Sequence, residues 1–314
     1  DRTELLLEFT TGLERVRIPV TAAQLTAEVR KFRLSLERRT TNQYLGPAQQ
    51  LYTWLITPVR ATLVKHQIET LVFVPDGALR TIPLAALHDG EHFLIEQFAC
   101  AVSPGVALVD ARPLPRGQIG AVAAGLSEAT QNFAALPGVP AELQAVAAAF
   151  QAPVLLNQQF TVAALQKDFS QHQFQVVHFA THGQVDKDIA RSFILTHDGR
   201  LTLDDLEALL RPAQFRGQPV ELLTLSACQT AAGDDRAALG LAGVAIKAGA
   251  RSAVATLWFV NDESTTLLME EFYRDVKTTS KAKALQQAQL KVLRDPRFGH
   301  AGYWAAYLLI GNWL

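Results

Sequence analysis

The sequence predicts an α/β domain with a mostly parallel central sheet, preceded by a helical segment. After Ile68, short β-rich apolar runs alternate with helical stretches, which is the order of elements in doubly wound α/β domains. These runs lack polar alternation, as expected for strands that are covered on both faces. A chain of 314 residues also buries enough surface to form a core without a disulfide or a metal.

Composition excludes several classes of protein. With 49% hydrophobic and 19% charged residues, extended disorder is not expected. Twenty-nine basic and 30 acidic residues nearly balance, which argues against a nucleic-acid partner or a membrane anchor. Only two cysteines occur, Cys100 and Cys228, so we expect a reducing, cytoplasmic setting rather than a secreted disulfide scaffold. Cys100 lies in an apolar run and is predicted to be an inert core thiol.

The elements follow in order along the chain. Residues 1–67 are predicted to be mainly helical, because Leu51, Leu55, Val59 and Leu63 recur at a spacing of four. The chain does not begin with Met or a signal peptide, and we expect it to be a fragment of a longer protein. The runs predicted as strands are 71–75, 119–123, 175–179, 221–225 and 252–257.

Several helices have recognisable ends. Thr202 is predicted to be an N-cap, with Asp205 three residues later as in a capping box, and Pro212 is expected to end that helix. Asn261 and Ser280 are predicted to cap two later helices.

Reactive residues follow two of the predicted strands. The run 176–183 ends in His182 and Gly183, and the run 222–230 contains Cys228. A cysteine thiolate is a nucleophile, and an imidazole stabilises it or protonates a leaving amine. The backbone N–H groups of Gly183 and Cys228 are candidate donors to an oxyanion. On spacing alone, a chance pair with a buried thiol is the more frequent explanation.

Two other sites are less favoured by the pattern. His178, His182 and Cys228 resemble a zinc ligand set, but on a strand the two histidines would lie roughly 13 Å apart. A buried, hydrogen-bonded His178 is therefore expected. Gly240 and Gly243 resemble part of a phosphate-binding turn, but the full glycine pattern is absent. We therefore expect these glycines to allow close packing of a helix on the sheet rather than to bind a nucleotide. We expect no metal and no organic cofactor.

The motifs resemble a known family. Phe-Ala-Thr-His-Gly at 179–183 followed by Leu-Ser-Ala-Cys-Gln-Thr at 225–230 is similar to the paired signature of CHAT domains, which are caspase-like relatives of cysteine peptidases and often carry tetratricopeptide repeats. The resemblance runs from about residue 68 to the end. Its further stretches are 74–79, 82–87, 136–143, 238–250, 255–262 and 302–313.

This resemblance implies a caspase-like three-layer α/β/α sandwich over residues 68–314, after the helical segment 1–67. It implies a cysteine endopeptidase, with Cys228 as nucleophile, His182 as catalytic histidine, and Gly183 and Cys228 as oxyanion donors. The substrate would be a protein or peptide. The resemblance also implies a bacterial protein that is regulated by an N-terminal repeat domain missing from this chain, or by an activating partner. Either an active or a latent state of this fragment agrees with the sequence. The alternative is a catalytically silent interaction or signalling module.

Three acidic residues are candidates for substrate selection. In separase, a distant relative of the same fold, an acidic residue after the corresponding strand meets a basic side chain, and Asp262 occupies that position here. An equally strong alternative is a carboxylate at a helix start, stabilised by the macrodipole. Asp186 and Asp188 follow His182 and are further acidic candidates; their alternative is a solvated loop charge.

Overall fold

The structure is a computed structural model. It covers residues 2–314 except 106–108, 110, 116, 185, 187–190, 216, 230–242, 244–245 and 247–248. The side chains of 214–215 and 227–229 are also outside the described part.

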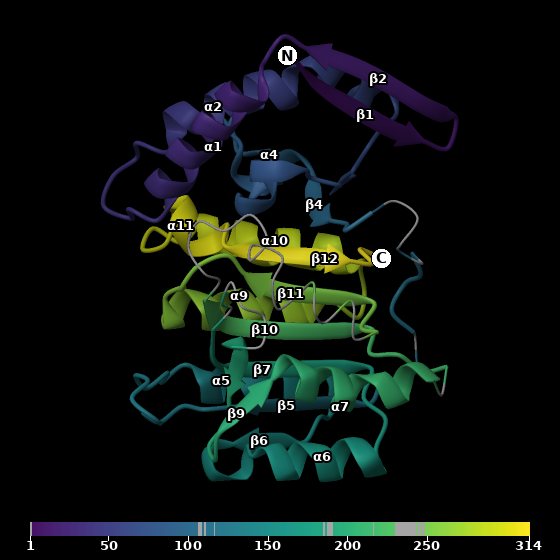
Figure 1. Cartoon of the computed structure of the whole chain (residues 1–314), viewed down its shortest axis with the longest axis vertical. Helices are drawn as coiled ribbons and strands as arrows, with labels where there is room; N and C mark the ends of the chain where they lie inside the picture. Colours follow the sequence, from purple (N-terminus) through teal and green to yellow (C-terminus); the bar gives the residue numbers. More distant parts are fainter. Residues whose placement is uncertain are drawn as a thin grey trace.

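One twisted sheet runs through the protein (Figure 1). Among the described residues it has ten strands. In sheet order these are β3 (Thr70–Phe73), β4 (Ala99–Val102), β12 (Tyr307–Gly311), β11 (Ser252–Thr256), β10 (Leu222–Gln229), β7 (Val176–Gln184), β5 (Ala121–Gly125) and β6 (Val154–Leu156), with β8 (Phe193–Leu195) and β9 (Arg200–Thr202) extending from β7.

Two groups of strands run in opposite directions. β11, β10, β7, β5 and β6 are parallel to one another. β12 is antiparallel to β11 and parallel to β4, which pairs with β3 in parallel. The carboxyl ends of β7 and β10 therefore lie side by side, at the kind of sheet edge where open α/β sheets bind ligands.

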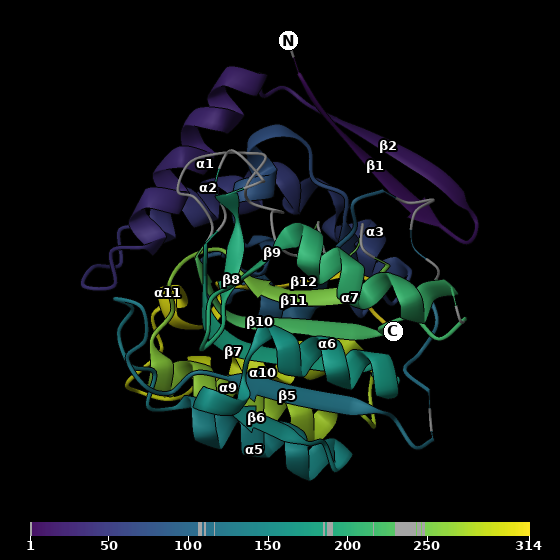
Figure 2. The same ribbon diagram turned by 60° about the horizontal axis from the view of Figure 1, so that its bottom comes forward.

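Helices cover both faces of the sheet (Figures 1 and 2). Within the described part of the chain, no helix has the length and apolar character needed to cross a membrane. One face carries α5 (Val139–Phe150), α9 (Asp262–Asp275) and α10 (Lys281–Leu293), and the other carries α6 (Val162–Gln171) and α7 (Leu203–Phe215). Shorter segments are α4 (Leu94–Gln97), α11 (Ala301–Trp304) and the 3-10 helices Gly77–Thr81, Leu84–Ala86 and Asn157–Gln159.

The three predicted N-caps are confirmed. The side chains of Thr202, Asn261 and Ser280 each accept a hydrogen bond from the backbone N–H three residues later. Asp205 completes the capping box by accepting from the Thr202 N–H. The expectation that Pro212 ends its helix is wrong, because α7 continues three residues beyond it. Proline has a helical φ itself, and it removes only one N–H near the end of this helix.

The first residues differ from the expected helical segment. β1 (Thr3–Phe9) and β2 (Gly12–Ile18) form an antiparallel hairpin. The side chains of β1 alternate between half-buried and exposed, which is the period of a strand. Helices begin only with α1 (Ala22–Leu36), followed by α2 (Leu45–Leu55) and α3 (Arg60–Lys65), with the 3-10 helix Thr57–Val59 between the last two.

The N-terminal helices pack onto the rest of the protein. Leu51, Leu55, Val59 and Leu63, which share the predicted spacing of four, are all buried. Together with Phe32 of α1 they belong to the same contiguous hydrophobic core as the strands of the sheet. Residues on both sides of the expected boundary at 67 and 68 therefore share one core.

Candidate active site at the carboxyl ends of two parallel strands

The register of β7 and β10 brings the two predicted motifs together. His182 lies opposite Ala227, and Gly183 lies opposite Cys228. A register shift between Leu225 and Ala227 marks a bulge just before these pairs, and such bulges re-aim side chains next to active sites. The paired backbones are one strand spacing apart, about 4.8 Å. The side chain of Cys228, and the residues from 230 to 242 with Gly240, lie outside the described part of the chain.

The imidazole of His182 is oriented by a backbone carbonyl. Its Nε2 lies 2.8 Å from the carbonyl oxygen of Ala134. Because a carbonyl oxygen only accepts hydrogen bonds, Nε2 must carry the proton of this bond. The second ring nitrogen, Nδ1, therefore remains for proton exchange with a reacting group.

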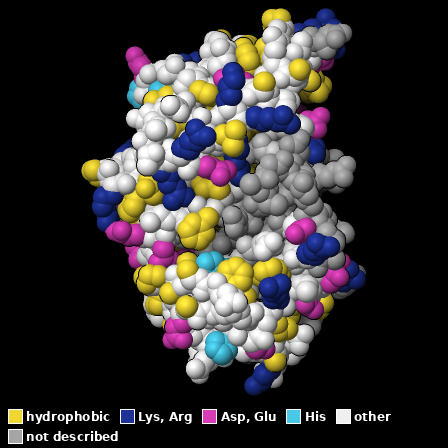
Figure 3. All heavy atoms as spheres, turned by 60° about the vertical axis from the view of Figure 1, so that its left-hand side comes forward, with side chains coloured by type: hydrophobic (Ala, Val, Ile, Leu, Met, Phe, Trp, Pro, Cys, Tyr) yellow, Lys and Arg dark blue, Asp and Glu magenta, His cyan; other side chains and the backbone are white. Residues whose placement is uncertain are grey.

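Two phenylalanine rings pack against the half-buried His182. The ring of Phe133 lies 5.1 Å from the imidazole at 33°. The ring of Phe259 lies 6.5 Å away and almost parallel, at 5°. Figure 3 shows one face of the molecule, on which basic, acidic and hydrophobic side chains are intermixed.

Asp262 connects two helices near His182. It lies in the first turn of α9, and its Oδ2 accepts a hydrogen bond of 2.5 Å from the N–H of Gly138, which precedes α5. A side chain at Gly138 would approach this carboxylate and Thr266 to within 3 Å. Burial raises the pKa of Asp262, and the His182 ring opposes this rise electrostatically.

The other acidic candidates lie after β7. Asp186 is half-buried, and its backbone N–H donates to Ser192 Oγ at 2.9 Å. Asp188 lies outside the described part of the chain.

A buried polar cluster lies on the face of β7 that α5 and α9 cover. Only one of its members was identified from the sequence. His178 Nδ1 is 2.9 Å from the hydroxyl of Tyr273, which donates to Thr224 Oγ1 at 2.7 Å. His178 Nε2 is 2.9 Å from Glu142 Oε1, and the two side chains are 0% and 2% exposed. Neither Nε2 nor Oε1 has a hydrogen-bond partner among the described residues, so the two buried side chains form a close polar contact rather than an aligned hydrogen bond.

This cluster confirms that His178 is buried and hydrogen-bonded. Among the described residues, no group of three metal-ligating side chains occurs. The signal for Glu142 was a charged residue on the apolar face of its helix, between Val139 and Val146. Tyr273 and Thr224 carried no comparable signal.

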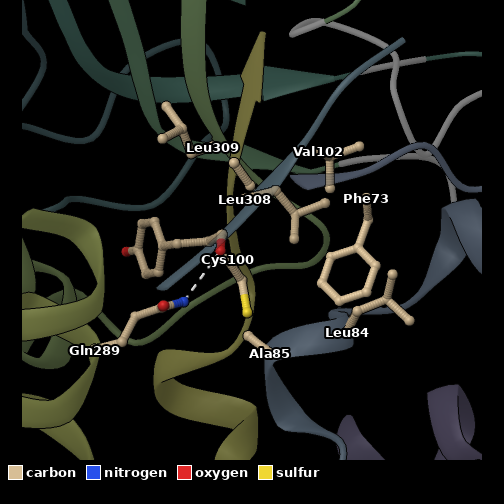
Figure 4. Close-up of a pocket in the computed structure, with 10 residues that line it drawn as sticks. Phe73, Leu84, Ala85, Cys100, Val102, Gln289, Leu308 and Leu309 are labelled. Atoms are coloured by element: carbon tan, nitrogen blue, oxygen red, sulfur yellow. Dashed lines mark hydrogen bonds between the residues drawn. The ribbon is translucent and has the colours of Figure 1, made fainter. Parts of the chain in front are cut away.

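Cys100 lies in a different environment. It belongs to β4 and lines a small apolar cavity with Phe73, Leu84 and Leu308 (Figure 4). Its Sγ contacts the Phe98 carbonyl oxygen at 3.6 Å. Cys100 is half-buried and packs against the hydrophobic core. Burial of its thiol raises the pKa to about 12, as expected for an unreactive cysteine.

Comparisons with known proteins identify the family and the fold. Residues 45–312 match the family model of the CHAT domain; the match begins inside the segment 1–67. The search of curated proteins gave no significant match. Among solved structures, the fold is similar to the crystal structure of the Arg-specific cysteine proteinase gingipain R, with a TM-score of 0.54 over 94% of this chain and 76% of that chain. At 7% identity the likeness concerns the fold alone, and it confirms the predicted caspase-like α/β/α sandwich.

Proposed function

Because the chain belongs to the CHAT domain family, we propose that it is a cysteine endopeptidase in which Cys228 and His182 form the catalytic dyad. The observation that carries this proposal is the register of β7 and β10. Cys228 lies opposite Gly183, and the preceding residue, Ala227, lies opposite His182. The Ala134 carbonyl supports it, because it fixes the tautomer that leaves Nδ1 of His182 available.

The proposed reaction has two stages. The Cys228 thiol transfers its proton to Nδ1 of His182, and the resulting thiolate attacks the scissile carbonyl carbon. The backbone N–H groups of Gly183 and Cys228 stabilise the oxyanion. His182 donates the Nδ1 proton to the leaving amine, which departs as the C–N bond breaks. In the second stage His182 Nδ1 takes a proton from water as the water oxygen attacks the thioester carbon. The C–S bond then breaks, the acid product leaves, and the Cys228 thiolate and the protonated His182 are regenerated.

The test of this function compares the effect of replacing Cys228 with the effect of replacing Cys100. A mixed peptide library is incubated with the protein and with Cys228→Ser, and new termini are identified by mass spectrometry. Cys100→Ser is the matched control, because it changes the same atom at the buried thiol. We expect cleavage by the unmodified protein and by Cys100→Ser, and none by Cys228→Ser.

The alternative is a catalytically silent interaction or signalling module. Equal, background-level cleavage by all three proteins, with ordinary reactivity of the Cys228 thiol, would favour that module. We further propose that the enzyme acts on proteins or peptides in the cytoplasm and that a region N-terminal to this chain, or an activating partner, regulates it. Adding such a partner to the same assay separates a latent enzyme from a silent module.

Asp262 is proposed to select a basic residue before the cut. Its bond to Gly138 uses Oδ2, and a carboxylate has further acceptor positions on both oxygens. Asp262→Asn removes the charge and keeps an oxygen that accepts the Gly138 N–H. We expect KM for peptides with Arg or Lys before the cut to rise at least about tenfold, as for the loss of a charged hydrogen bond, while KM for uncharged peptides stays constant.

Steady-state kinetics on matched peptides measure this effect. Glu263→Gln is the control, since Glu263 is an exposed neighbour that pairs with Arg297. The same assay on Asp186→Asn tests the second acidic candidate. Unchanged KM in Asp262→Asn would leave Asp262 with its structural bond to Gly138 alone.

A further inference from the structure

The N-terminal segment holds the backbone that leads from β11 to α9. Arg33, in the last turn of α1, donates from Nη2 to the carbonyl oxygen of Leu257 and from Nη1 to that of Thr81, each at 2.7 Å. Its guanidinium carbon lies 4.7 Å from the centre of the Trp258 ring. Because the Arg33 side chain is only 13% exposed, these bonds are shielded from water.

A second arginine binds the same stretch two residues further on. Arg39 follows α1, and its Nη2 donates to the carbonyl oxygen of Phe259 at 2.5 Å. The Arg39 guanidinium carbon lies 4.8 Å from the Tyr303 ring. Residues 257–259 are therefore held by hydrogen bonds from two arginines that lie more than 200 positions away in the sequence.

This stretch adjoins the proposed active site. The Phe259 ring lies almost parallel to the imidazole of His182. Three residues later, Asp262 binds Gly138, at the end of the loop whose Ala134 carbonyl orients His182. Any displacement of 257–259 consequently changes the surroundings of the histidine from the side of Phe259.

We infer that Arg33 and Arg39 are positioning residues that hold Phe259 against His182, so that residues 22–39 form part of the site. These residues precede the range 45–312 that matches the CHAT family model. Their effect on the reaction rests on the proposed peptidase function, whereas their effect on the histidine does not. A movement of α1 would thus be transmitted to the imidazole through the backbone of 257–259.

The chemistry of arginine suits this role. Its planar guanidinium offers several fixed donors, so one Arg33 side chain serves two carbonyl oxygens and Glu37 at once. Lysine has a single compact charge and cannot reproduce this fork. Arg33→Lys is therefore expected to have the same kind of effect as Arg33→Ala with a smaller magnitude.

The experiment measures the histidine directly. The full chain is labelled with 13C-histidine, and the His182 signal among the eight histidines is assigned with His182→Gln. We expect Arg33→Ala and Arg39→Ala to shift the His182 ring signal toward its position in Phe259→Ala, because the ring current of Phe259 is lost. Arg30→Ala and Arg38→Ala are matched controls on exposed arginines of the same segment and are expected to leave the signal unchanged.

A second readout follows the reaction. Alkylation of Cys228 by iodoacetamide is expected to slow about ten- to a hundredfold in Arg33→Ala, as for a small misplacement of a catalytic group. If Arg33→Ala does not fold, Arg33→Lys and Arg39→Ala carry the test. An unchanged His182 signal in these variants overturns the inference. A shifted signal in a protein that cleaves no peptide supports the inference and contradicts the proposed peptidase.

Discussion

Replacing His182 by alanine is expected to slow alkylation of Cys228 by iodoacetamide at pH 7 about thirtyfold. An ordinary cysteine is only about 3% thiolate at this pH, whereas a neighbouring imidazolium holds the reactive form. Cleavage of a susceptible peptide should fall further, by about 10²- to 10⁴-fold, because general acid catalysis is also lost. Mass spectrometry of the alkylated peptides gives the first rate, and a quenched peptide gives the second.

Two controls make this result specific. Cys100 reacts in neither protein, because a thiol whose pKa is raised to about 12 is about 10⁻⁵ thiolate at pH 7; its alkylation should rise only above about pH 10. His182→Gln keeps an N–H that can donate to the Ala134 carbonyl but has no titrating nitrogen. Equal Cys228 rates in the unmodified protein, His182→Ala and His182→Gln would contradict the dyad.

Breaking the buried pair of His178 and Glu142 is expected to cause the largest loss of stability. Either His178→Leu or Glu142→Leu leaves a charged or polar partner in a core position that is at most 2% exposed. Such losses cost about 3–5 kcal/mol of the free energy of unfolding. The double substitution removes both polar groups together and should cost far less than the sum of the two single substitutions.

Urea unfolding followed by circular dichroism measures this double-mutant cycle. Glu263→Leu provides the exposed comparison, because the Arg297–Glu263 pair is more than half exposed on both sides and such pairs contribute about 1 kcal/mol or less. Additive effects of the two core substitutions would show that His178 and Glu142 do not act as a pair.

Local patterns identified five of the ten strands that the structure describes in the sheet, and the starts of three helices. All five apolar runs are strands, although their ends shift by one or more residues. The caps Thr202, Asn261 and Ser280 were predictable because a cap involves only the next three residues. The hairpin over 3–18 was missed because three consecutive leucines hide the alternation of β1, and β2 is exposed over most of its length. Its core contacts are also remote in sequence.

The candidate site divides in the same way. The sequence by itself determined that a histidine and a cysteine lie at the ends of two strands of a parallel sheet. The type of strand and its end depend on neighbouring residues, namely a short apolar run and the small or polar residues that follow it. Only the tertiary structure decided that the Ala134 carbonyl orients the imidazole, that the Phe259 ring stacks on it, and that Arg33 donates a hydrogen bond to the Leu257 carbonyl. Two of these three contacts use backbone carbonyls, which every residue carries and which no sequence motif marks. All three join residues far apart along the chain, so they arise from the packing of the helices against the sheet.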